Sequence, residues 1–197
     1  MKIQVYLIRH GKTAGNLKRA YIGSTDQPLS KQGREELLAM GRLAVPDALW
    51  RSPLRRCGET AAILYPAVPA QVCADLRECD FGAFEGKTYD QLKDEPGYRR
   101  WLDCGGTVPF PGGEDPMAFR ARSRLAFGSI AADTAKRYPG GTLAVVCHGG
   151  TIMAVLEAFS DPRSSFYDWQ APNGGGYRFF YDPDLGRAEG IIPLARG

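Results

Sequence analysis

Hydrophobic residues along the chain gather in short runs that alternate with longer amphipathic stretches. The run at 143–147 contains no polar residue, which is typical of a strand covered on both faces of its sheet. Longer stretches in which apolar positions recur every three or four residues indicate helices. We therefore predict strands at 2–8, 47–50, 70–74, 143–147, 176–182 and 188–194, and helices at 30–45, 54–65, 114–138 and 150–159.

Local signals support several of these boundaries. Ser30 is a suitable N-cap for the first helix, because its hydroxyl can accept a hydrogen bond from a free backbone N–H. Pro66 ends the second helix, since proline has no N–H to donate. The turn at 182–186 favours an antiparallel hairpin between the last two strands. Strands that alternate with helices predict a layered α/β fold.

Residues 75–113 interrupt this alternation. The segment is rich in glycine, proline and aromatic residues, and it carries two short predicted helices at 88–94 and 96–103. A chain of 197 residues fits one domain. We therefore interpret the segment as an excursion from the sheet and not as a separate domain.

Composition excludes several classes of protein. The net charge of +3 is small and dispersed, so it gives no indication of a nucleic-acid partner. The five cysteines are odd in number and lack Cys-x-x-Cys spacing, which argues against a disulfide framework or a zinc knuckle. No apolar run approaches the roughly 20 residues of a membrane span, and the first run ends at Arg9 without the form of a signal peptide. We expect a cytoplasmic protein with no membrane partner.

The chain has two histidines, and both lie in the same local setting. His10 follows the first predicted strand and precedes Gly11, and His148 follows the strand at 143–147 and precedes Gly149. Ligands of open α/β sheets bind beyond the carboxyl ends of the strands. We therefore predict that the two histidines are neighbours in one site.

Five sequence blocks, in order, resemble the histidine phosphatase superfamily in its phosphoglycerate mutase-like branch. The blocks occupy residues 7–16 (LIRHGKTAGN), 21–30 (YIGSTDQPLS), 52–61 (SPLRRCGETA), 76–86 (LRECDFGAFEG) and 145–150 (VVCHGG). The resemblance implies a three-layer α/β sandwich with a mostly parallel central sheet flanked by helices. It also implies a single domain over 1–197, with a cap-like excursion at about 86–113.

The resemblance assigns roles in phosphoryl transfer. His10 would be the nucleophile that forms a phosphohistidine, with its tautomer fixed by the carbonyl of Gly11. A carboxyl group must then protonate the leaving oxygen and later activate water. The resemblance points to Glu78 for this role. Asp80 remains a rival, because residues two apart face the same side of an extended segment, and Glu85 is expected to hold a loop amide.

Phosphate binding is expected to rest on arginine, whose planar fork of donors matches phosphate oxygens. By position, the resemblance selects Arg9 and Arg55, and Arg56 is interpreted as a solvated arginine at the start of a helix. The remaining expected phosphate contacts are the side chains of Asn16 and His148 and the backbone amide of Gly149 at a helix N-terminus. No metal or cofactor is implied.

Within the superfamily, two features are similar to the α-ribazole phosphatase group. The first is the block that begins at Tyr21, and the second combines Tyr98 and Trp101 with residues 111–114 and Arg122 of the long helix. Met153 departs from the pattern, because an arginine is common there. For the aromatic residues of the excursion two interpretations stay open, a cap that contacts a ring-bearing leaving group or a small satellite core. As a cap, it would use Tyr21, Trp101 and Phe110.

We predict a metal-independent phosphomonoesterase that acts on a small phosphorylated metabolite, α-ribazole 5′-phosphate being one candidate. Mutases of this branch are longer and carry a tail that closes over the site, whereas residues 194–197 form a short tail here. A mutase must keep water from its phosphorylated intermediate, so the short tail favours a phosphatase. A phosphoglycerate mutase, a phospho-binding scaffold and a metallohydrolase are the alternatives.

Overall fold

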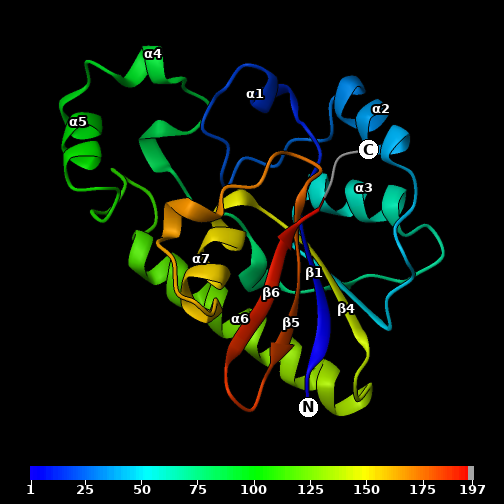
Figure 1. Ribbon diagram of the computed structural model, residues 1–197. Helices are drawn as coiled ribbons and strands as arrows, with labels where there is room; N and C mark the ends of the chain where they lie inside the picture. The colour runs from blue at the N-terminus through cyan, green and yellow to red at the C-terminus, as the bar shows by residue number, and fades with distance from the viewer. Residues whose placement is uncertain (195–197) are drawn as a thin grey trace.

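One six-stranded sheet forms the centre of the computed structural model, which describes residues 1–194; residues 195–197 of the predicted tail lie outside it. The strands lie in the order β3-β2-β4-β1-β5-β6. Figure 1 shows β4, β1, β5 and β6 side by side. Strands β3, β2, β4 and β1 pair in parallel, whereas β5 and β6 add an antiparallel edge. Their bounds are β1 Ile3–Arg9, β2 Ala48–Arg51, β3 Gln71–Val72, β4 Thr142–Cys147, β5 Gly176–Asp182 and β6 Arg187–Pro193.

The helices follow the expected order, with short additions. Their bounds are α1 Ala14–Leu17, α2 Lys31–Met40, α3 Arg55–Leu64, α4 Tyr89–Leu92, α5 Pro96–Asp103, α6 Pro116–Arg137 and α7 Gly149–Phe159, with 3-10 helices at Ala74–Leu76, Gly82–Phe84 and Phe166–Trp169. Ser30 caps α2 as predicted, accepting from the amide of Gly33. The predicted extension of this helix to residue 45 is wrong, because Gly41 adopts a left-handed φ of 77° and ends it.

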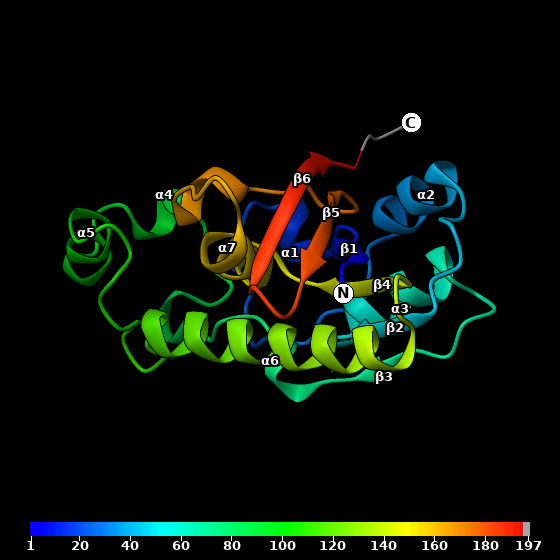
Figure 2. The same ribbon diagram turned by 60° about the horizontal axis from the view of Figure 1, so that its bottom comes forward.

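Helices cover both faces of the sheet, which gives three layers. Alternate residues of a strand face opposite sides, and the two hydrophobic cores follow that alternation. Leu7 of β1 and Val145 of β4 pack in the core under α6 and α7, whereas Ile8 and Val146 pack in the core under α2 and α3. Figure 2 shows α6 across one side of the sheet, with α2 and α3 on the other.

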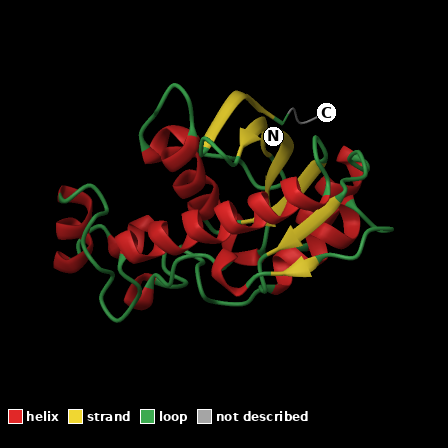
Figure 3. Cartoon of the chain, turned by 90° about the horizontal axis from the view of Figure 1, so that it is seen from below, coloured by secondary structure: helices red, strands yellow, loops and turns green. Residues whose placement is uncertain are grey.

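The excursion lies at one end of the molecule, away from most of the strands (Figure 3). Its helices α4 and α5 carry Leu92 and Tyr98, which are buried in a third hydrophobic cluster together with Phe84 and Phe110. The expectation of a satellite core is thus confirmed for part of the segment. Among residues 1–194, no helix is both long and apolar enough to cross a bilayer.

Strand pairing decides which distant segments meet. Strands β1 and β4 are parallel neighbours, with Arg9 in register with Cys147. The residues that follow, His10 and His148, therefore leave the sheet side by side at its carboxyl edge, although 138 positions separate them in sequence (148 − 10). Their rings lie edge to face with centroids 5.2 Å apart, so the two histidines share one site as predicted.

Candidate active site

The His10 ring is held in one tautomer by contacts on both nitrogens. Its Nδ1 lies 2.7 Å from the carbonyl oxygen of Gly11, which can only accept, so Nδ1 carries the proton. Its Nε2 accepts a hydrogen bond of 3.1 Å from Nε of Arg56, so Nε2 keeps its lone pair. Burial, followed by the charge of Arg56, lowers the pKa of His10 well below its usual value. The ring is thus held neutral, with the lone pair on Nε2.

The expected placement of Arg55 in the site is wrong, and Arg56 takes the position. Arg55 points into solvent and pairs with Glu59 one turn further along α3, with a distance of 2.7 Å. Arg56 is fully buried, and beyond His10 its guanidinium donates to the carbonyls of Gly23 and Thr25. Successive residues on a helix point about 100° apart, so only one of two adjacent arginines can face the sheet edge.

Arg9, the last residue of β1, lines the cleft beside the N-terminus of α7. Its Nη1 donates to the carbonyl of Ala171 at 2.7 Å. The backbone at Gly149 comes so close that a Cβ there would be 3.3 Å from the guanidinium carbon of Arg9. The cation and the first amides of an eleven-residue helix therefore meet at one place, an arrangement that favours a bound anion.

His148 is completely buried, and Ser52 orients it. The Oγ of Ser52 lies 2.7 Å from Nε2 of His148 and also accepts from the amide of Leu54. Burial and the charge of Arg56 lower the pKa of His148 well below its usual value. Both effects favour the neutral form of His148.

Glu78 presents its carboxyl group at the wall of the cleft. Its Oε2 accepts from the amide of Gly150 at 3.0 Å, and its Oε1 accepts from the amide of Cys79. A Cβ at position 150 would collide with this carboxylate, so a larger residue there would displace the carboxyl group of Glu78. Burial raises the pKa of Glu78, and it outweighs the two backbone donors and the charges of Arg56 and Arg9.

The two rival carboxylates have other partners. Asp80 accepts from Ser24 Oγ and from the amide of Gly82. Glu85 accepts from the amides of Gly23 and Ser24, which confirms the expectation that it holds loop amides. Neither carboxylate is among the residues that line the cleft, whereas Glu78 is.

Asn16 also lines the cleft, but its side-chain carbonyl oxygen already accepts hydrogen bonds within the protein. The oxygen accepts from the amide and hydroxyl of Thr13, which caps the short helix α1. It also accepts from the side-chain amide of Asn173, which in turn donates to the carbonyl of His10. The amide nitrogen of Asn16 is thus the atom that can donate to a phosphate oxygen.

A cleft of about 410 Å³ opens beside Arg9, Asn16 and Glu78, within the size range of small-molecule sites. The buried side chains of His10, Arg56 and His148 are not among the residues that line it. One part of its wall is polar, with Arg9, Glu78 and the start of α7. The remainder is largely apolar and comes from the loop after α1, the excursion, the start of α6, and α7 with the segment that follows it. These lining residues include Tyr21, Phe81, Trp101, Phe110, Phe119, Met153 and Phe166, together with Arg120, which is paired with Glu157.

A family profile described as the histidine phosphatase superfamily, branch 1, matches residues 5–191. The chain belongs to this superfamily. The matched residues include His10, Arg56, Glu78 and His148.

Relatives of the chain within this superfamily carry more than one name. The chain is 35% identical over 135 residues to a probable phosphoglycerate mutase GpmB of Salmonella choleraesuis, over 64% of this chain and 62% of the relative, less than two thirds of either. In fold it is similar to a putative alpha-ribazole-5′-P phosphatase from Escherichia coli, with a TM-score of 0.80 and 21% identity over 99% and 97% of the two chains. It is also similar to a phosphoglycerate mutase from Thermus thermophilus, with a TM-score of 0.71 and 27% identity over 98% and 99%. The names therefore do not decide between phosphatase and mutase.

Sequence reasoning missed the contacts by which three residues hold the candidate site together, although Arg122 was named as part of a family pattern. Ser52 lies within the third sequence block, four positions before Arg56, and only the folded chain reveals its contact with His148. Asn173 lies outside the five blocks and supports the His10 loop from a segment that has no regular structure. Arg122, on α6, contacts the segment that carries Glu78. The five cysteines are all free, and no three His, Cys, Asp or Glu side chains of residues 1–194 gather as candidate metal ligands.

Proposed function

We propose that this histidine phosphatase hydrolyses small phosphomonoesters through a phosphohistidine on His10, without a metal ion. The observation that carries the proposal is the pair of contacts on the His10 ring. Gly11 fixes the proton on Nδ1, and Arg56 faces Nε2, where it also meets the phosphoryl oxygens of an arriving substrate. A nucleophilic lone pair and a cation are thus directed at the same place.

In the first step, Nε2 of His10 attacks phosphorus, and a P–N bond forms as the ester P–O bond breaks. The protonated carboxyl of Glu78 gives its proton to the leaving oxygen, which departs as the alcohol. In the second step, the Glu78 carboxylate takes a proton from water, and the oxygen of that water attacks phosphorus. The P–N bond breaks, inorganic phosphate forms, and His10 is again neutral with its proton on Nδ1.

Phosphoryl transfer depends mainly on positioning and on charge stabilisation. Arg9, Arg56 and the amide of Gly149 supply positive potential around the phosphate. His148 is neutral in the free site, and the charge of a bound phosphate would raise its pKa and favour a second N–H donor. Asn16 adds a neutral donor through its amide nitrogen.

The leaving group is proposed to be apolar or ring-bearing. Support comes from the aromatic wall of the cleft, to which Tyr21, Trp101 and Phe110 contribute. Arg120, the cation on this side, is already paired with Glu157 at 3.2 Å and lies 3.9 Å over the Phe166 ring. Such a wall suits a ring better than the short acidic body of phosphoglycerate, and α-ribazole 5′-phosphate is one ester of the suitable kind.

The test is phosphate release from a panel of esters with EDTA present. The panel contains p-nitrophenyl phosphate, 3-phosphoglycerate, nucleoside monophosphates and α-ribazole 5′-phosphate, and His10→Ala is the control. We expect hydrolysis that EDTA does not affect and that the variant loses. Interconversion of phosphoglycerates without phosphate release would instead establish a mutase, and no turnover of any ester would favour a phospho-binding scaffold.

The assignment of the acid is tested in the same assay. Glu78→Gln should lower turnover by about a hundredfold or more, within the usual range for a general acid. Asp80→Asn should have little effect, because Asp80 does not line the cleft and accepts hydrogen bonds from Ser24 and Gly82 instead. The reverse ranking would exclude Glu78 as the acid.

A further inference from the structure

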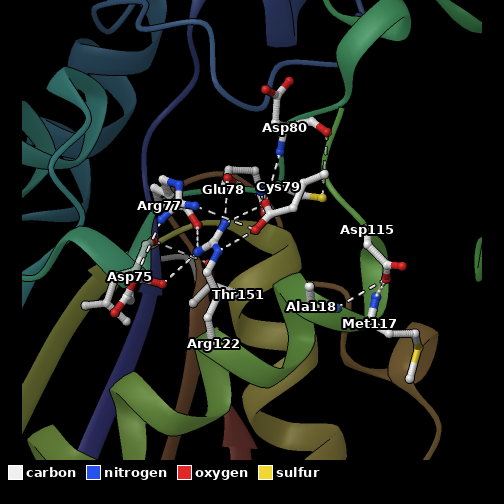
Figure 4. A network of polar contacts seen from close by, with 12 residues as sticks. Asp75, Arg77, Glu78, Cys79, Asp80, Asp115, Met117, Ala118, Arg122 and Thr151 are labelled. Atoms are coloured by element: carbon white, nitrogen blue, oxygen red, sulfur yellow. Dashed lines mark hydrogen bonds and ion pairs between the residues drawn. The ribbon is translucent and has the colours of Figure 1, made fainter. Parts of the chain in front are cut away.

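Arg122 makes an extensive set of contacts beside the site without lining the cleft. It lies on α6, and its side chain is 14% exposed. Its Nη1 donates to the carbonyls of Asp75 and Arg77 at 2.7 and 2.8 Å, and one Nη2 bond of 3.1 Å goes to the carbonyl of Glu78 (Figure 4). The Nε and Nη2 of the guanidinium also donate to the two carboxylate oxygens of Glu114, at 2.7 and 2.8 Å.

The segment held in this way has no strand beside it. A 3-10 helix ends at Leu76, and residues 77–81 have no regular structure. Glu114 clamps the far end of the segment, since its backbone amide donates to the carbonyl of Asp80 at 2.9 Å and its carboxylate accepts from the Asp80 amide. Arg122 and Glu114 thus replace the hydrogen bonds that a neighbouring strand would supply.

Pairing with Glu114 also balances the charge of Arg122. Burial opposes ionisation of Glu114, but the hydrogen bond and charge of Arg122 keep the pKa of Glu114 below its usual value. The cations that lower the pKa of Glu78 are Arg56 and Arg9. Arg122 therefore holds the backbone of Glu78 while its own charge is largely directed at another carboxylate.

We propose that Arg122, paired with Glu114, is a positioning residue that aims the Glu78 carboxyl at the leaving oxygen of the substrate. The inference rests on the proposed function. Arg122 does not line the cleft, so its contribution passes through the main chain of residues 75–78. A misplaced acid fails to protonate the leaving group even though the nucleophile and the phosphate site remain intact.

Leaving-group dependence separates this role from general structural support. p-Nitrophenolate is stable as an anion and departs with little help from an acid, whereas an alkoxide needs a proton. The ratio kcat/KM reports the steps up to departure of the alcohol, so it isolates the first transfer. We therefore compare kcat/KM for p-nitrophenyl phosphate and for an alkyl phosphomonoester in wild type, Arg122→Gln and Arg122→Lys.

In Arg122→Gln, we expect a loss of about thirtyfold with the alkyl ester and less than about threefold with p-nitrophenyl phosphate, following the size of general-acid effects. Glu78→Gln should show the same selectivity, and adding Arg122→Gln to it should cost little more, because the two residues act as one unit. The matched control is Arg124→Gln, an exposed arginine two positions along α6, which should leave both rates unchanged.

The following outcomes would overturn the positioning role of Arg122 or the proposed function. Equal losses with both esters, or losses that multiply in the double variant, would overturn the positioning role while leaving the proposed function in place. Absence of hydrolysis in wild type and in Arg124→Gln would remove the proposed function itself, and this inference with it. If thermal melting shows that Arg122→Gln is unfolded, Arg122→Lys decides, since it keeps the charge but lacks the planar fork of donors.

Discussion

Arg55 and Arg56 are neighbours in sequence with opposite surroundings. Arg55 makes an ion pair with Glu59 at the surface, and such exposed pairs contribute about 0–1 kcal/mol to stability. Arg56 is buried beside His10, and its guanidinium donates to His10 Nε2 and to two loop carbonyls. The structure thus predicts unequal consequences for the same substitution at adjacent positions.

We expect Arg56→Gln to lower kcat/KM for p-nitrophenyl phosphate by about a hundredfold or more, the usual consequence of losing a donor to transition-state charge. Arg55→Gln should stay close to wild type, because its side chain does not reach the site. Steady-state kinetics of the two variants, with melting curves as a check of folding, make the measurement. A larger defect in Arg55→Gln would contradict the geometry.

The sequence predicted Arg55 in the site, whereas the structure places Arg56 there. The sequence supplied the right block and the right residue type, but two arginines satisfied both. Which of them faces the sheet edge depends on the rotation of α3, and that rotation is set by packing of Cys57, Ala61 and Leu64 into the core. A shift of one position is therefore invisible until the helix is in place.

The pH dependence of kcat/KM should be bell-shaped. As pH falls, His10 gains a proton and loses its lone pair; burial and Arg56 lower its pKa, so activity persists below the usual titration of histidine. As pH rises, Glu78 loses the proton it must donate; burial raises its pKa, so that loss moves to higher pH. Since Arg56 lowers the pKa of both groups, Arg56→Gln should move both limbs to higher pH. Limbs that stay in place, after the ionisation of the substrate is measured separately, would refute this account.

At the scale of elements, the excursion serves two structural purposes at once. Leu92 and Tyr98 are fully buried and form its own core. Trp101 stacks on Tyr98 and also lines the cleft. The two interpretations of the aromatic residues are therefore compatible, because different side chains of α4 and α5 would carry them.

Trp101→Ala and Leu92→Ala should separate these purposes. Loss of the Trp101 ring should raise KM for ring-bearing esters by about two- to tenfold, the equivalent of one aromatic contact. Leu92→Ala should instead lower stability by about 2–5 kcal/mol through a core cavity, with little change in substrate preference. The measurements are KM across the ester panel and unfolding by denaturant. Equal changes in preference in both variants would show that the excursion acts only as a scaffold.

Most strands and long helices could be predicted because their own sequence determines them. The run in β4 is apolar throughout and is buried on both faces. Helix α1, in contrast, has four residues and depends on the capping box between Thr13 and Asn16. It is too short to show a periodic hydrophobic pattern, so the sequence does not predict it. The sequence predicted that the segment around Glu78 is irregular. It did not predict the hydrogen bond from Arg122 to the carbonyl of Glu78, because 44 positions separate the two residues.

At the scale of the whole molecule, the site exists only when distant segments meet. His10 and His148 come from adjacent parallel strands, Arg56 from α3 on one face, and Glu78 from a segment held by α6 on the other. None of these elements carries the site alone. Binding of an anion at their junction should therefore stabilise the entire fold, because the ligand binds the folded chain and not the unfolded one.

We expect inorganic phosphate to raise the melting temperature. At a hundred times its dissociation constant a ligand adds about 2.7 kcal/mol, and each kcal/mol shifts Tm by about 2–4 °C for a domain of this length. The measurement is Tm against phosphate concentration, with chloride of equal ionic strength as the control. Arg55→Gln should retain the shift, and Arg56→Gln, compared with its own phosphate-free state, should lose most of it. A full shift in Arg56→Gln would place the phosphate elsewhere. Since binding needs no turnover, this experiment tests the anion site separately from the chemistry proposed for His10 and Glu78.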